Sequence, residues 1–204
     1  MTDKIETRSF VEFRVSHEGD APAIEGYAIV FNSQSEDLGG FREVIAPAAV
    51  DRALAEGHDV RALIDHDSGK ILGRSKSGTL QMTKDEHGLK VRISPPDTTY
   101  ARDLMKVVER GDVSGMSFAF ITPEGGDSWT RSDSGTPLRT VTDLYLRDVS
   151  VVTYPAYPAT EVAVRSLEEF TKSEQPKVEP PAYDPSLDPK LILLRRKQHE
   201  VESE

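Results

Sequence analysis

The segment from Val113 to Phe120 constrains the fold of this chain more than any other. Its last five residues alternate large and small side chains, and a period of two predicts a β-strand. In such a strand Met116, Phe118 and Phe120 face a core, while Ser117 lies on the opposite face beside little bulk. A substrate could reach a serine in that position. Most serines have no catalytic role, however, so this segment alone favours a half-buried edge strand.

A histidine flanked by two carboxylates follows the apolar segment Val60 to Ile64. A turn and a second short strand, Ile71 to Arg74, come next. We therefore expect the strand to end on His66, where an imidazole can titrate and move protons. A serine alone is a poor nucleophile, but a base that takes its proton activates it. A third group that orients the base completes the logic of a serine hydrolase triad.

The segment from Leu144 to Pro158 contains a possible orienting group, Asp148. Three blocks in this order resemble the HK97-type prohead serine proteases of tailed bacteriophages, and the resemblance runs from about residue 8 to residue 165. The blocks are the His66 segment with Leu72-Gly73-Arg74, then Gly115-Met116-Ser117-Phe118, then Asp148-Val149-Ser150-Val151-Val152-Thr153-Tyr154-Pro155-Ala156. Each block is a weak signal, whereas all three in the right order are a strong one.

The resemblance implies a β-rich α+β fold: a closed, mostly antiparallel β-barrel surrounded by a few helices, as in the herpesvirus capsid-maturation proteases. It also implies a serine endopeptidase that cleaves scaffold and capsid-protein segments, and itself, during procapsid maturation. The expected partners are the phage major capsid protein and its scaffold segment, and further copies of the chain in a homo-oligomer. The expected location is the assembling procapsid in the host cytoplasm.

Carried over to this sequence, the resemblance implies Ser117 as the nucleophile, His66 as its base and Asp148 as the group that orients the base. Ser114 is the nearest rival nucleophile, although its place before a glycine is more typical of a strand entry or turn. The family more often has a glutamate at the position of Asp148, and the herpesvirus relatives use a second histidine there. A different third member of the triad therefore stays open.

Asp65 and Asp67 are alternative partners for His66, but neighbours in a strand point to opposite faces, so we expect them to be solvated or salt-bridged. Ser150 shares the face of Asp148 and could lend it a hydrogen bond, although a strand serine without a role is favoured. The oxyanion hole stays unassigned, with Arg74 and Arg139 as candidates. The alternative function is a catalytically silent barrel that serves as a capsid-assembly or scaffold-binding component.

Composition excludes several other functions. The chain has 204 residues, 35 acidic against 25 basic side chains, and a formal net charge of −10, which disfavours binding to nucleic acid. It has no cysteine, and its five histidines show no spacing typical of a metal hydrolase, so we expect no metal and no cofactor. No stretch has the length or apolarity of a signal peptide or membrane span, so we expect a soluble cytoplasmic protein without membrane contact.

The chain is long enough for one domain, which we place at residues 1–166. Five of the thirteen prolines lie beyond it, so we expect a proline-rich linker at 167–189 and a charged tail at 190–204. We also expect the paired glycines at 39–40 to make a mobile loop, and Trp129 to cover apolar surface on a hairpin arm. The other expected elements are strands at 9–15 and 24–31, a helix at 47–57, a hairpin at 79–83 and 89–94, and a helix at 98–110.

Overall fold

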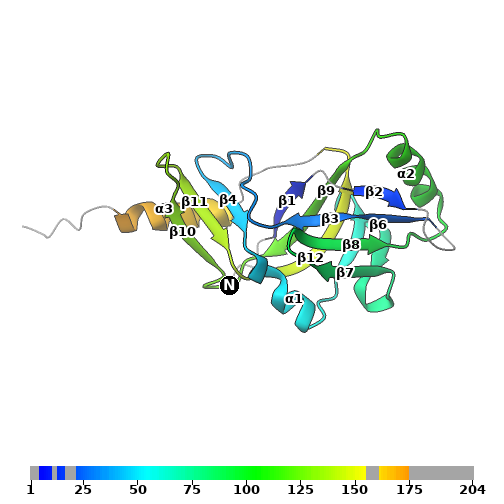
Figure 1. Ribbon diagram of the computed structural model, residues 1–204, viewed down its shortest axis with the longest axis horizontal. Helices are drawn as coiled ribbons and strands as arrows, with labels where there is room; N and C mark the ends of the chain where they lie inside the picture. Colours follow the sequence, from blue (N-terminus) through cyan, green and yellow to red (C-terminus); the bar gives the residue numbers. More distant parts are fainter. Residues whose placement is uncertain (1–4, 11–12, 17–21, 155–160, 175–204) are drawn as a thin grey trace, which may run out of the picture. The chain divides into compact units, whose positions relative to one another are not determined.

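The computed structural model describes residues 5–10, 13–16, 22–154 and 161–174, and Figure 1 shows their arrangement. These residues form a strand-rich α+β fold with three sheets, which confirms the predicted class. The predicted charged tail and most of the predicted linker lie outside the described residues. No helix in the described part of the chain is long and apolar enough to span a membrane.

The five-stranded sheet carries the predicted site residues, and its strand order is β1-β9-β12-β5-β6. Its strands are β1 (Glu6–Phe10), β5 (Arg61–Ile64), β6 (Asp67–Arg74), β9 (Gly115–Ile121) and β12 (Tyr145–Val152). β9 lies between β1 and β12 and is antiparallel to both, whereas β12 and β5 are parallel. The strand with Ser117 therefore lies in the interior of the sheet, beside the strand with Asp148.

The four-stranded sheet has the order β2-β3-β8-β7 and is antiparallel throughout. Its strands are β2 (Phe13–Ser16), β3 (Ala23–Val30), β7 (Leu80–Lys84) and β8 (Gly88–Ile93). The predicted hairpin at 79–83 and 89–94 is confirmed as β7 and β8. Apolar side chains of β3 and β8 join those of β9 and β12 in one core, so the two sheets share their apolar faces.

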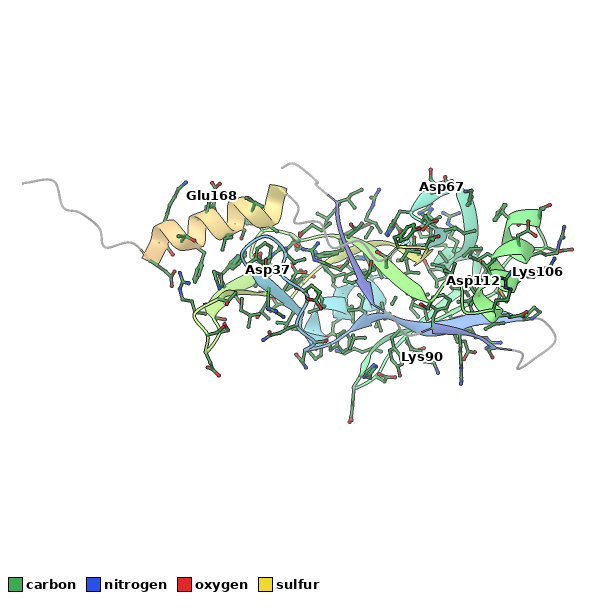
Figure 2. The ribbon with its side chains drawn as sticks, turned by 90° about the horizontal axis from the view of Figure 1, so that it is seen from above. Asp37, Asp67, Lys90, Lys106, Asp112 and Glu168 are labelled. Atoms are coloured by element: carbon green, nitrogen blue, oxygen red, sulfur yellow. The ribbon has the colours of Figure 1, made fainter. Side chains whose placement is uncertain are left out.

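The three-stranded sheet has the order β10-β11-β4. Its strands are β4 (Arg42–Ile45), β10 (Asp127–Arg131) and β11 (Pro137–Val141). Here Trp129 packs with Leu38 and Phe41 in a small apolar cluster, its ring 5.1 Å from that of Phe41, which confirms its predicted packing role. The side chains of Leu38 and Phe41 also anchor the loop around Asp37, labelled in Figure 2, which we had expected to be mobile.

The helices are short and cover the sheets. They are the 3₁₀ turns η1 (Pro47–Val50) and η2 (Ser75–Ser77) and the α-helices α1 (Asp51–Ala55), α2 (Thr99–Glu109) and α3 (Glu161–Glu174). The predicted apolar stripe of α2, at i, i+3, i+4 and i+7 from Ala101, is buried, as expected for an amphipathic helix. The helix predicted at 47–57 is confirmed as η1 and α1, and Gly57 follows it with φ 62°.

Two predictions of architecture were wrong. A closed barrel needs its first and last strands to pair, but in the described part of the chain β1 and β6 end the five-stranded sheet without pairing with each other. The predicted strand at 9–15 is divided between two sheets, because β1 pairs with β9 while β2 pairs with β3. Within the range predicted as a linker, α3 keeps residues 167–174 helical, and the compact unit extends to Phe170.

Candidate active site

Strand β9 places Ser117 at the centre of the five-stranded sheet. Met116, Phe118 and Phe120 are completely buried in the main core, which confirms the predicted face of the strand. Ser117 itself is only 1% exposed, so a substrate cannot reach it directly in this structure, contrary to what the strand pattern suggested. Strand β1 pairs with β9 in a register that sets Ser9 opposite Ser117. The Ser117 hydroxyl lies 2.8 Å from the backbone carbonyl oxygen of Arg8.

His66 lies in a two-residue turn between β5 and β6 rather than at the end of a strand. Asp65 and His66 have φ angles of 49° and 58°, so both are in the left-handed region. Two successive residues with positive φ are the mark of the tight hairpin turn whose twist suits a β-ribbon. Histidine is among the non-glycine residues enriched in this region, although the conformation costs about 1 kcal/mol or more. The turn therefore holds the imidazole in a strained, defined position.

Asp65 fixes this turn to strand β12. Its backbone N–H donates to the carbonyl oxygen of Val151 at 2.9 Å, and its carboxylate accepts from the backbone N–H of Thr153 at 2.8 Å. Asp65 is exposed to solvent, as expected, but its carboxylate also has a structural role that the sequence did not predict. Asp67 lies at the surface in Figure 2 and is paired with Lys70 at 3.5 Å, as expected. Neither carboxylate is the partner of the His66 ring, because the ring bonds elsewhere.

The His66 ring links the two other predicted residues. Its Nδ1 lies 2.6 Å from Asp148 Oδ1, and its Nε2 lies 2.8 Å from Ser117 Oγ. An ionised carboxylate only accepts hydrogen bonds, so the proton on the neutral ring belongs to Nδ1 and leaves Nε2 as an acceptor. The side chains of His66 and Asp148 are 26% and 14% exposed, so the pair is largely shielded from water. This is the geometry of a nucleophile, a base and a group that orients the base.

The single proton of the Ser117 hydroxyl has two possible acceptors. Both His66 Nε2 and the carbonyl oxygen of Arg8 lie 2.8 Å from Oγ. A carbonyl oxygen cannot donate, so the Ser117 proton points either to Arg8 or to the imidazole. Only the second orientation prepares the hydroxyl for proton transfer to His66.

The other candidates lie elsewhere in the structure. Ser114 is exposed and precedes β9, and the serine that meets His66 is Ser117. The Arg74 guanidinium binds the Asp59 carboxylate at 2.7 and 2.6 Å, and the hydrogen bond from Arg74 lowers the pKa of Asp59 to about 2. Arg139 is buried and binds a set of carboxylates. The guanidinium donors of both arginines are thus engaged with carboxylates.

A buried ionic network, which the sequence analysis missed, holds β1 in place. Arg139 of β11 bonds to Glu6 at 2.6 Å, to Glu43 at 2.9 Å and to Asp127 at 2.5 Å. Arg8 bonds to Glu43 at 2.8 Å and to Glu6 at 3.2 Å. Arg8 and Glu6 come from β1 and Glu43 from β4, so the network joins strands of two sheets. The backbone of Arg8, which meets Ser117, is therefore anchored by its own side chain.

The network shifts the pKa values of two of its members, Glu6 and Arg139. Burial alone raises the pKa of Glu6, but the hydrogen bond and charge of Arg139, with the charge of Arg8, outweigh it and lower the pKa below its ordinary value. Burial also disfavours the charged form of Arg139, which for a base lowers the pKa. The hydrogen bonds to Glu6 and the charges of Glu43 and Asp127 outweigh burial and raise the pKa of Arg139 above its ordinary value. Glu6 and Arg139 are therefore both ionised at neutral pH. Its charged residues lie far apart in the sequence, and no local pattern could have revealed it.

A family model described as caudovirus prohead serine protease matches residues 9–173 of the chain. The chain belongs to this family. The family predicted from the sequence is thereby confirmed.

One relative in sequence and one solved structure are similar to the chain. The chain is 31% identical to the prohead protease of Enterobacteria phage HK97 over 168 residues. This aligned region covers 80% of this chain and 69% of the phage HK97 protein. The structure of the bacteriophage T4 capsid assembly protease matches with a TM-score of 0.43 and 13% identity, over 72% of this chain and 98% of that chain. The second likeness is too low to bear on the site.

Proposed function

We propose that the chain is a serine endopeptidase in which Ser117 is the nucleophile, His66 the general base and Asp148 the residue that orients His66. The observation that carries this proposal is the His66 ring, whose two nitrogens lie 2.6 Å from Asp148 Oδ1 and 2.8 Å from Ser117 Oγ. Membership of a serine protease family supports the same chemistry.

The reaction follows from the positions of the protons. Ser117 Oγ attacks the carbonyl carbon of the scissile peptide while its proton passes to His66 Nε2. Asp148 accepts from Nδ1 and stabilises the imidazolium that forms. His66 then gives the proton to the leaving amine, and the C–N bond breaks to leave an acyl group on Ser117. A water molecule, deprotonated by the same imidazole, releases that group and restores the serine.

A substrate can reach Ser117 only after a local movement of the groups that shield its hydroxyl. The residue is 1% exposed, and the Arg8 carbonyl lies against its hydroxyl, while the His66 side chain is 26% exposed. A peptide therefore approaches from the side of His66, and the Ser117 proton must point to Nε2 rather than to the Arg8 carbonyl for the hydroxyl to react. The buried network that anchors β1 opposes a larger displacement of that strand.

The proposed substrates are scaffold and capsid-protein segments of a tailed phage, and the proposed place of action is the procapsid in the host cell. The name of the family and of the HK97 relative support this assignment. The major capsid protein, its scaffold segment and further copies of the chain are the proposed partners. The chain itself is a further proposed substrate, and because cleavage needs extended backbone we expect no cut within α3, which is helical to Glu174.

The first test uses a fluorophosphonate, which reacts with activated serines. We expect the full-length protein to gain one adduct on Ser117, located by peptide mass spectrometry. Ser117→Ala and His66→Ala should remain unlabelled, whereas Ser114→Ala, a matched change in an exposed serine three residues away, should be labelled like the wild type. Absence of labelling in the wild type would favour a catalytically silent capsid-assembly component. Labelling that disappears in Ser114→Ala alone would transfer the role to Ser114.

The second test is the intact mass of the wild type and of Ser117→Ala after expression and purification side by side. We expect the wild type to lose residues beyond Glu174 and the variant to keep its full mass. The same truncation in Ser117→Ala would mean that host proteases cut the chain. A labelled, full-length wild type would refute self-cleavage.

A further inference from the structure

Ser150 lies inside the candidate site although the sequence favours no role for it. It belongs to β12, is completely buried, and lies directly opposite Ser117 in the β9–β12 pairing. On its other side it is the partner of Leu63 in β5, two residues before the turn that carries His66. The residue therefore lies between the strand of the nucleophile and the strand that leads to the base.

The Ser150 hydroxyl contacts both partners of the Asp148–His66 pair. Its Oγ lies 2.8 Å from Asp148 Oδ1 and 3.2 Å from His66 Nδ1. The ionised carboxylate can only accept, so Ser150 donates to Oδ1. His66 Nδ1 donates to the same oxygen at 2.6 Å. Two donors, one from β12 and one from the turn between β5 and β6, thus converge on one carboxylate oxygen.

Asp148 needs such support because its surroundings are irregular. The pairing of β12 with β9 shifts register between Leu146 and Asp148, so the residue lies at a bulge. The terminal torsion of an aspartate has a broad, roughly two-fold preference, so the backbone alone does not select which oxygen faces His66. A buried hydroxyl two residues along the strand does select it. The bond is charge-assisted, and hence stronger than a bond between neutral groups.

We propose that Ser150 is a positioning residue of the catalytic unit: its hydroxyl holds Asp148 Oδ1 where it meets His66 Nδ1. The inference rests on the proposed peptidase function of the same site. Ser150 does not touch the substrate and donates no proton in the reaction. Its effect is to keep the imidazole in the tautomer and orientation that leave Nε2 free to take the Ser117 proton.

The kinetic test compares Ser150→Ala with Ser16→Ala, which removes another buried serine hydroxyl from a different sheet. On a peptide that the wild type cleaves, we expect Ser150→Ala to lower kcat about tenfold with KM unchanged, and Ser16→Ala to leave both unchanged. Ser150→Cys, of similar size but a weaker donor, should lie between Ser150→Ala and the wild type. Equal kcat in Ser150→Ala and the wild type would overturn the inference.

A double-mutant cycle separates positioning from plain packing. In an Asp148→Ala background the Ser150 hydroxyl has no carboxylate to hold, so we expect Ser150→Ala to lower kcat no further there. The same tenfold loss in both backgrounds would mean that Ser150 acts through packing alone, and the inference would be wrong. If Ser150→Ala does not fold, the cycle is run with Ser150→Cys and decides in the same way.

A spectroscopic readout does not depend on activity. The proton on His66 Nδ1, whose nitrogen lies 2.6 Å from Asp148 Oδ1, should give a low-field ¹H resonance assigned by its loss in His66→Ala. We expect Ser150→Ala to shift or broaden this resonance and Ser16→Ala to leave it in place. A wild type without peptidase activity would refute the proposed function, while the resonance would still decide whether Ser150 positions Asp148. An unchanged resonance in Ser150→Ala would overturn the inference.

Discussion

Replacing Arg139 with methionine removes the cation around which the buried network of β1 is built. Arg139 is 1% exposed and bonds to the carboxylates of Glu6, Glu43 and Asp127 at 2.5 to 2.9 Å. Methionine has a similar length and no charge, so the packing changes little. Arg8 remains as the only guanidinium that the described structure places on both Glu6 and Glu43.

The size of the expected loss of stability in Arg139→Met follows from the burial of its carboxylate partners. Removing one partner of a buried ion pair costs about 3 to 5 kcal/mol, because the remaining charges lose their compensation without regaining water. In a domain of this size each 1 kcal/mol shifts Tm by about 2 to 4 °C, so we expect Arg139→Met to lower Tm by about 6 to 20 °C at pH 7.

The assay is thermal unfolding followed by far-UV circular dichroism and by the fluorescence of Trp129, the only tryptophan, which pairs with Arg139 across β10 and β11. The matched control is Arg74→Met, in which an arginine with a side chain 44% exposed loses its bidentate partner Asp59. Because solvent screens that pair, the control should shift Tm far less. Equal shifts in the two variants would refute the argument that the buried network stabilises the fold.

Acid should reduce the difference between Arg139→Met and the wild type. The folded-state pKa of Glu6 is lowered below the ordinary 4.5, so its ionised form stabilises the wild type above that pH and the stabilisation is lost as pH falls through the folded value. Without Arg139 that pKa rises, and protonation relieves the uncompensated charge. The Tm deficit of Arg139→Met should therefore be largest near neutral pH and shrink below about pH 4.5. A deficit that grows on acidification would contradict the assignment of Glu6 as the main partner.

Two further substitutions test the site and the fold. Asp148→Asn keeps the size of the side chain but removes its charge, so we expect kcat to fall roughly 10²- to 10⁴-fold, less than in Ser117→Ala. Asp148→Glu should retain more activity than Asp148→Asn. Wild-type turnover in Asp148→Asn would require another orienting group. Gly88→Ala would place a Cβ 2.0 Å from the carbonyl oxygen of Ile29, so we expect a large decrease in Tm. In Gly69→Ala the Cβ meets only the end of the exposed Asp67 side chain, at 3.1 Å, so we expect a much smaller decrease. Similar melting of the two alanine variants would show that β3 and β8 can separate without cost.

Much of the local structure could be predicted, because burial imposes its period on the sequence. The alternation from Met116 to Phe120 predicted β9 and its buried face, and the spacing from Ala101 to Val108 predicted α2. Ser117, His66 and Asp148 could be selected because each lies in a block that resembles the family. The structure then brings the three side chains within hydrogen-bonding distance.

The sequence by itself thus determined which segments become strands or helices and which groups are available for chemistry. Only the tertiary structure decided that β1 covers Ser117, that His66 adopts a left-handed turn, and that Ser150 meets Asp148. These features depend on strand register, which is set by the packing of whole sheets rather than by neighbours along the chain. The buried network is the clearest case, because charged side chains are ordinarily exposed. Glu6, Glu43 and Arg139 can be buried only after the fold has brought their opposite charges together.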